Sequence, residues 1–182
     1  MRGASQNEGI VDLINERTVH LNMADKFMGY DCIGRGSFMG RIVAVCTSEK
    51  KGTRKKNVGT GTMVENFGLA GDAHGGEWHR QISLLAIESI RKMQEKGLNV
   101  VPGDFAENLT TEGIDLPALP VGTKLRIGEK VLGEVTQIGK VCHNKCAVYY
   151  QAGDCVMPKE GIFIKVLEGG SVEVGDEIEV LS

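Results

Sequence analysis

The chain has 182 residues, of which 41% are hydrophobic and 25% are charged, so it is long enough for one domain with a substantial core. Its formal net charge of −3 at pH 7 argues against a general nucleic-acid binder or a protein of anionic membrane surfaces, because both need a broad excess of Lys and Arg. The apolar stretches are far shorter than the roughly 20 residues of a membrane-spanning helix, and we expect a cytoplasmic protein.

The amino-terminal segment differs in pattern from the rest of the chain. Residues 1–38 have no strong hydrophobic period and end in a glycine-rich stretch before a Met-Gly pair. We interpret residues 1–38 as a leader, tag-derived or disordered, and residues 39–182 as a single domain. A genuine extension with a short helix around residues 11–15 is the competing interpretation.

The domain itself opens with a strand and a basic loop. Residues 41–45 are mostly β-branched or small and apolar, which predicts a buried first strand, with Cys46 beyond it as a core residue. The loop at residues 48–57 carries five positive charges within seven residues. We expect this loop to be solvated, with attraction of a phosphate group as the alternative.

One helix is predicted in the middle of the chain, after a glycine-rich loop at residues 71–76. Ser83 has the character of a helix N-cap, and Ala86, Ile90 and Met93 follow at helical spacing before Gly97. The pattern therefore predicts an amphipathic helix that starts near Ser83, stops at Gly97 and packs on the rest of the domain.

Short strands dominate the carboxy-terminal half. Alternating or β-branched runs at residues 124–127, 131–138 and 162–167, and the paired run at residues 172–180, are separated by Gly-containing turns. Strands joined by such turns favour a closed or nearly closed barrel. We therefore predict a mainly β fold with minor α content: a β-barrel with one or more packed helices.

Cysteines mark the expected chemistry. An odd number of cysteines without an export signal fits free thiols better than a disulfide framework. Cys142 and Cys146 follow the predicted strand at residues 131–138, where a loop would hold them at the mouth of the barrel. Lys140, His143 and Lys145 surround them, and neighbouring positive charge lowers the pKa of a cysteine. The loop therefore predicts a reactive thiolate.

Three other interpretations of this loop stay open. A zinc site would use Cys142, His143, Cys146 and Cys155, but a second pair of ligands with the usual spacing is missing. A redox pair would need Cys-x-x-Cys rather than the Cys-x-x-x-Cys spacing found here. The cysteines could also serve only as packed core residues.

Three segments, in order, resemble the motifs of the MOSC domain, the module named after the carboxy-terminal part of molybdenum-cofactor sulfurase. The first is the Gly-Asp-containing stretch at residues 71–76 with residues 80–83. The second is the Phe-Ala-Glu-Asn-Leu block within residues 103–113, and the third is Cys142-x-x-x-Cys146. The resemblance spans residues 39–182 and implies a β-barrel that binds the pterin-based molybdenum cofactor.

The same resemblance implies roles for the cysteines. Cys146 matches the family's reactive cysteine best and would carry sulfur or contact molybdenum, with Cys142 as the second candidate and His143 tuning the thiol. Lys145 stands where larger relatives often have Arg, and the pyridoxal-phosphate domain that generates persulfide in full sulfurases is absent from this sequence. The chain would then be pyridoxal phosphate-independent, taking sulfur from a cysteine desulfurase or passing cofactor to a molybdoenzyme.

Whether the domain is an enzyme stays open at this point, since some relatives use bound cofactor to reduce N-hydroxylated compounds. Arg80 is the best candidate for the cofactor's phosphate, because a guanidinium offers two parallel donors to an oxyanion. Asn108 could bind a pterin edge or cap a turn. The full set of expected cofactor contacts is Asp72, His74, Arg80, Asp104, Glu107, Asn108 and Lys145.

Overall fold

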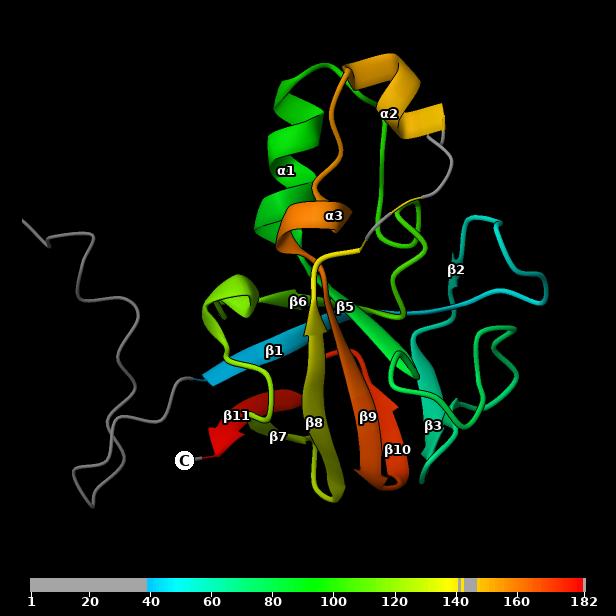
Figure 1. The fold of residues 1–182 in the computed structure, drawn as a ribbon, viewed down its shortest axis with the longest axis vertical. Coiled ribbons are helices and arrows are strands. Elements are labelled where there is room, and N and C mark those ends of the chain that lie inside the picture. Colours follow the sequence, from blue (N-terminus) through cyan, green and yellow to red (C-terminus); the bar gives the residue numbers. More distant parts are fainter. Residues whose placement is uncertain (1–38, 141, 143–146, 182) are drawn as a thin grey trace, which may run out of the picture.

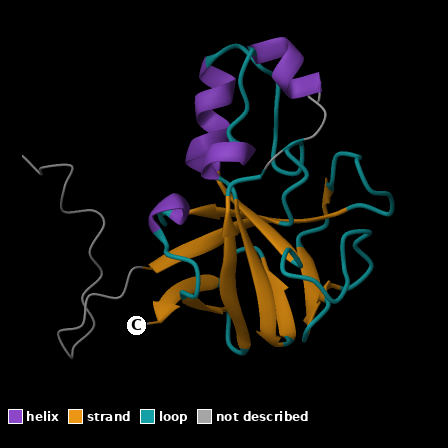
Figure 2. Ribbon diagram, viewed as in Figure 1, coloured by secondary structure: helices purple, strands orange, loops and turns teal. Residues whose placement is uncertain are grey.

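The computed structural model describes residues 39–140, 142 and 147–181. The interpretation of residues 1–38 as a leader falls outside this part of the chain. Within it, strands greatly outnumber helices, and the helices gather at one end of a barrel (Figure 1, Figure 2). The predicted fold class, mainly β with packed helices, is confirmed.

The barrel is one sheet that closes on itself in the described part of the chain (Figure 1). Its strands, in spatial order, are β11 (Glu177–Leu181), β7 (Lys124–Ile127), β8 (Val131–Ile138), β9 (Ile162–Glu168), β5 (Ile82–Ala86), β6 (Leu109–Glu112) and β1 (Met39–Thr47). Pairing of β11 with β1, in register at Gly40 and Ile178, closes the ring. All neighbours are antiparallel except β5 and β6, which run parallel.

Smaller elements surround this barrel. The short strand β2 (Lys56–Asn57) pairs with the end of β1, and a second sheet joins β10 (Gly170–Glu173), β3 (Thr60–Val64) and β4 (Gly68–Leu69). The helices are α1 (Ile87–Glu95), α2 (Ala147–Ala152) and α3 (Met157–Glu160), with a 3-10 turn η2 (Leu116–Ala118). No helix in the described part of the chain is long and apolar enough to cross a membrane.

Two hydrophobic clusters follow from the alternation of side chains along the strands. Ile82, Leu84 and Ile164 belong to the first cluster, which collects side chains from the barrel strands. Leu85 and Phe163, one position along, belong to the second, which packs the sheet against α1, α2 and α3. β5 is therefore buried on both faces, and the helical layer sits on it.

The helix prediction was right in its end and wrong in its start. α1 begins at Ile87 and ends just before Gly97, where φ is +88°. Ser83 is not its N-cap but a central residue of β5, pairing with Phe163 of β9. The serine hydroxyl is directed to Asn108 instead of to a helix terminus, with an O···O distance of 3.0 Å.

Candidate functional site

A loop between β4 and β5 carries three of the predicted site residues, Asp72, His74 and Arg80. The loop is glycine-rich, and Gly71 and Gly76 both have positive φ, which the absent Cβ permits. Its backbone is fixed by short bonds: the Ala73 amide donates to the Ser48 carbonyl at 2.8 Å. The loop therefore presents its polar side chains from a defined backbone.

Asp72 forms a buried ion pair with Lys55, a contact that the sequence did not reveal. Each side chain is only 1% exposed, and the Lys55 ammonium donates directly to Oδ2 of Asp72. The amide of Ser48 also donates to Oδ2 at 2.9 Å, and the amide of His74 donates to Oδ1 at 3.0 Å. The expectation that residues 48–57 form a solvated loop is wrong for Lys55, since Asp72 provides the carboxylate that lets its charge be buried.

The charges of this pair depend on each other. Burial raises the pKa of Asp72, but the hydrogen bonds from Lys55 and the Ser48 amide and the positive charge of Lys55 outweigh it and hold that pKa well below its usual range. Burial lowers the pKa of Lys55, although the hydrogen bond and charge of Asp72 oppose the effect. Each ion is buried because the other is present.

Arg80 has an unusual environment for a cation. Its guanidinium carbon lies 4.8 Å from the ring centre of Trp78 and 5.7 Å from that of Phe163. Its Nε is buried and has no hydrogen-bond partner among residues 39–140, 142 and 147–181. Cation–π contacts hold the guanidinium in place without neutralising it, so its donors are available to an oxyanion.

The segment around Arg80 is tied to the end of β8, from which the cysteine loop leaves. His79 and Gln137 are joined by a contact of 3.1 Å between Nε2 and Oε1, and Gln137 Nε2 donates to the Gly139 carbonyl at 2.7 Å. The Thr136 hydroxyl also donates to the carbonyl of His79. Arg80 and the start of the cysteine loop therefore share one hydrogen-bonded framework.

Gly139 makes the turn that starts this loop. Its φ is +73°, and a Cβ there would lie 2.3 Å from the carbonyl oxygen of Pro158. Its amide donates to the Gly161 carbonyl at 2.7 Å. Only glycine fits at this position, because a side chain would meet backbone on the segment after α3.

The cysteines fall in different environments. Cys142 is exposed, whereas Cys155 and Cys46 are buried. Cys46 is a core residue, as predicted from the sequence. The predictions for Cys146, His143 and Lys145 concern positions outside the described residues. Among the described residues no three His, Cys, Asp or Glu side chains form a group suited to a metal ion.

We expect unequal thiol reactivity from these environments. Burial raises the pKa of Cys46 to about 12, with the charge of Glu107 adding to the effect, so this thiol stays protonated and unreactive. Alkylation with iodoacetamide followed by peptide mass mapping should label Cys142 in the folded protein and Cys46 only after unfolding in urea. Equal labelling rates for the two cysteines in the native protein would contradict this prediction.

Asp104, Glu107 and Asn108 are engaged with the protein itself. Asp104 accepts a bond from the Val101 amide at 3.1 Å and pairs with Arg54 at 3.3 Å. Glu107 is fully buried and accepts from the amides of Gly103 and Phe105 and from the Thr110 hydroxyl. Asn108 joins β6 to β5 and β1 through bonds to Ser83 and Cys46. The geometry gives all three a part in holding the loop at residues 101–108, and their predicted contact with cofactor stays a prediction.

A sequence model of the MOSC domain matches residues 70–179, which is more than half of the chain and includes the loop of Asp72, His74 and Arg80 and the strand that leads into the cysteine loop. The chain belongs to the MOSC domain family. No curated protein matches this MOSC domain in sequence.

Solved structures share the fold of this MOSC domain. The YuaD protein of Bacillus subtilis superposes with a TM-score of 0.67 at 20% identity, over 79% of this chain and 96% of that chain. YiiM of Geobacillus stearothermophilus gives a TM-score of 0.59 at 18% identity, over 79% and 75% of the two chains. YiiM of Escherichia coli gives 0.53 at 21% identity, over 79% and 68%. At such identities the similarity concerns the fold.

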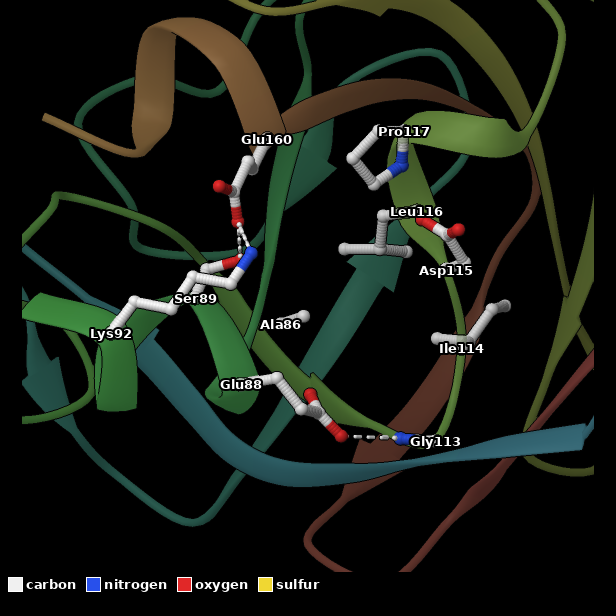
Figure 3. A pocket seen from close by; sticks show the side chains of 10 residues that line it. All are labelled: Ala86, Glu88, Ser89, Lys92, Gly113, Ile114, Asp115, Leu116, Pro117 and Glu160. Atoms are coloured by element: carbon white, nitrogen blue, oxygen red, sulfur yellow. Dashed lines mark hydrogen bonds and ion pairs between the residues drawn. The ribbon is translucent and has the colours of Figure 1, made fainter. Parts of the chain in front are cut away.

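Several hollows of ligand size lie in the described part of this MOSC domain, and two of them, at different places, exceed 500 Å³. One of about 510 Å³ has Trp78, His79 and Gln81 in its wall, the residues that flank Arg80 in sequence. Another of about 560 Å³ lies between α1, η2 and α3 (Figure 3). In the second, Ser89 and Lys92 converge on Glu160, and Oε1 of Glu88 accepts from the Gly113 amide, while Oε2 of Glu88 is buried without a partner among the described residues (Figure 3). The first hollow, whose wall includes the sequence neighbours of Arg80 but not Arg80 itself, is the better candidate for a site.

Sequence reasoning missed two kinds of functional residue in this MOSC domain. Lys55 is one of five basic residues in its loop, and no sequence pattern distinguishes it from the other four. Gln137 was taken only as part of a strand, although it is the residue that links His79 to Gly139. The sequence signal for Gln137 is a polar residue two positions before a glycine, Gly139, at the end of a predicted strand.

Proposed function

We propose that this MOSC domain binds the molybdenum cofactor at the site around Arg80 and carries the cofactor or its sulfur on a cysteine of the loop after β8. The observation that supports the proposal most directly is Arg80: a guanidinium in cation–π contact with two aromatic rings, with a buried Nε that has no hydrogen-bond partner among the described residues. The phosphate of a pterin cofactor would supply the oxyanion that this group lacks.

The residues present fit such a group. Arg80 would hold the phosphate, and the hollow of about 510 Å³ lined by its sequence neighbours Trp78, His79 and Gln81 is within the range of volumes usual for small-molecule sites. When bound, the cofactor would supply molybdenum, a metal with affinity for soft sulfur ligands. The chain's own contribution would be to orient the cofactor and to offer it a thiolate.

The thiolate would come from Cys146, with Cys142 as the second candidate and His143 and Lys145 as the neighbours that lower its pKa. The link from His79 through Gln137 to Gly139 places the start of this loop beside the segment of Arg80. In the proposed cycle, a cysteine desulfurase supplies sulfur to the thiol, and a molybdoenzyme accepts the cofactor or the sulfur. We propose that this exchange takes place in the cytoplasm, as the sequence led us to expect.

Removal of the Arg80 charge should abolish most binding. We expect Arg80→Met to weaken cofactor binding by roughly 10- to 100-fold, the loss of a charge-assisted contact worth about 1.5–3 kcal/mol. Stability should change little, because Arg80 forms no ion pair with a described residue and its contacts there are the cation–π contacts. The measurement is molybdenum and pterin bound per chain after anaerobic incubation with the cofactor, beside an unfolding curve of each protein.

The control is Arg126→Met, which removes an arginine of β7 that pairs with Glu179 and is 55% exposed in its side chain. It should bind as wild type does. Cys146→Ala and Cys142→Ala, tested in the same way, identify the working thiol. If wild type binds no cofactor, the proposal fails; if it turns over N-hydroxylated compounds with bound cofactor, the domain is an enzyme and not a carrier.

A further inference from the structure

The ammonium of Lys55 contacts both Asp72 and His74, and its contact with His74 determines which ring nitrogen of that histidine carries the proton. Besides its bond to Asp72, Nζ of Lys55 lies 3.3 Å from Nδ1 of His74. Of the His74 groups, the backbone amide is the one that meets hydrogen-bond geometry toward Asp72, whereas Nδ1 lies 3.4 Å from Oδ1. An ammonium group has three donors and no acceptor, so the contact of Lys55 with Nδ1 is a hydrogen bond only if Nδ1 carries the lone pair. The proton of a neutral imidazole must then be on Nε2.

We infer that Lys55 is a positioning residue that holds His74 as the Nε2–H tautomer, so that His74 donates a hydrogen bond to an oxygen of the bound ligand. The inference rests on the proposed function for the identity of that ligand, but the tautomer belongs to the protein alone. It also defines the chemistry of the partner, which must be an acceptor: a phosphate oxygen or a carbonyl of the pterin.

The opposite tautomer would direct a proton on Nδ1 to Oδ1 of Asp72. That distance is 3.4 Å, close to the 3.3 Å between Nδ1 and Nζ of Lys55, but Oδ1 already accepts from the amide of His74 at 3.0 Å. A proton on Nδ1 would also face the Lys55 ammonium at 3.3 Å, which places two donors against each other. The geometry therefore favours the lone pair at Nδ1.

The position of the ring supports a role toward a ligand. The side chain of His74 is 25% exposed, whereas its two partners are 1% exposed, so the Nδ1 edge faces the buried ion pair and the Nε2 edge is the accessible one. The carbonyl of His74 accepts from the indole of Trp78 at 3.0 Å, and Trp78 is one of the rings beneath Arg80. The proposed donor thus belongs to the same loop as the proposed phosphate anchor.

The tautomer is measured directly by NMR. In ¹⁵N-labelled protein without cofactor, at about pH 8 where an ordinary imidazole is neutral, long-range ¹H–¹⁵N spectra should show an unprotonated Nδ1 and a protonated Nε2 for His74. His74→Gln identifies the signals by their loss. Lys55→Met should reverse the tautomer, because Nδ1 then loses its donor and faces the uncompensated Asp72. His79, in contact with Gln137, should keep its signals and is the matched control.

A protonated Nδ1 in the wild-type protein overturns the inference, and this result needs no variant to fold. The role toward the ligand is tested by binding: His74→Leu should weaken cofactor affinity roughly 10-fold, the effect of one lost bond to a charged acceptor. His74→Gln, whose amide nitrogen can donate from the position of Nε2, should retain most of the affinity. Equal losses in both variants overturn the donor role, whereas absence of binding in wild type refutes the proposed function and leaves the tautomer result standing.

Discussion

Replacement of Asp72 by alanine is expected to lower the free energy of unfolding by about 3–5 kcal/mol, the cost of leaving a buried ion without its partner. The ammonium of Lys55 is 1% exposed and would lose its only carboxylate contact in the described structure, and the amides of Ser48 and His74 would lose their acceptor. Urea denaturation followed by circular dichroism measures the change.

Two further variants test whether the loss of stability in Asp72→Ala comes from the unpaired charge of Lys55. Glu179→Ala breaks an exposed pair with Arg126 and should cost about 0–1 kcal/mol. The double variant Lys55→Met with Asp72→Leu should recover much of the loss, because it removes both charges instead of stranding one. A loss below about 1 kcal/mol for Asp72→Ala would mean that the buried groups are not an ion pair.

The ion pair of Asp72 and Lys55 also predicts how the stability difference between wild type and Asp72→Ala depends on pH. Because the pKa of Asp72 is depressed in the folded protein, its stabilisation is complete above the unfolded-state value of about 3.9 and is lost as pH falls through the lower folded-state value. The difference in unfolding free energy between wild type and Asp72→Ala should therefore stay constant from neutral pH down to about pH 4 and shrink only below it. A difference that declines already between pH 7 and pH 5 would contradict the assignment.

The sequence predicted the antiparallel half of the barrel well because its strands have one buried and one exposed face. β7 and β8 have the predicted bounds, residues 124–127 and 131–138, and their buried residues alternate along the strand. Alternation of this kind is a local property, readable without knowing the partner strand. β9 was also found, with an end that differs by one residue.

The sequence failed at β5 for a physical reason. This strand is buried on both faces, so it has no alternation, and it runs directly into α1 without a turn. Its parallel partner β6, at residues 109–112, lies across a long connection and gives no local signal. A continuous apolar run that precedes a helical pattern was therefore interpreted as the start of the helix.

Some residues of the candidate site were predicted from the sequence and others were not. The motifs identified Asp72, His74 and Arg80, which the structure places in one loop, because glycine-rich segments are readable in sequence. The burial of Lys55 depends on a contact between residues 17 positions apart, and a charged residue has no mark in sequence that distinguishes a solvated position from a paired one. The role of Glu107 is equally hard to predict from sequence, because its hydrogen-bond donors, the amides of Gly103 and Phe105 and the Thr110 hydroxyl, reach its carboxylate only once the loop is folded.

Replacement of Glu107 by alanine is expected to cost about 3–5 kcal/mol, since it creates a small cavity and strands several buried donors at once. Both carboxyl oxygens are in use, for the amides of Gly103 and Phe105 and for the hydroxyl of Thr110. Ala106, which lies between Phe105 and Glu107, has a φ of +63°, which costs energy for a residue with a Cβ and needs the bonds of Glu107 to hold it. Thermal and urea unfolding of the variant measure the loss.

The Glu107→Gln variant distinguishes the effect of ionisation of the Glu107 carboxyl group from the effect of its hydrogen bonds. Burial raises the pKa of Glu107, while its hydrogen bonds oppose the shift without cancelling it, so its contribution to stability is complete below the ordinary value of 4.5 and declines as pH rises through the folded-state pKa. The deficit of Glu107→Gln relative to wild type should accordingly be larger at pH 4.5 than at pH 8. If Glu107 instead serves the cofactor, Glu107→Ala would unfold as wild type does and lose only binding, and the loop would owe its shape to other contacts.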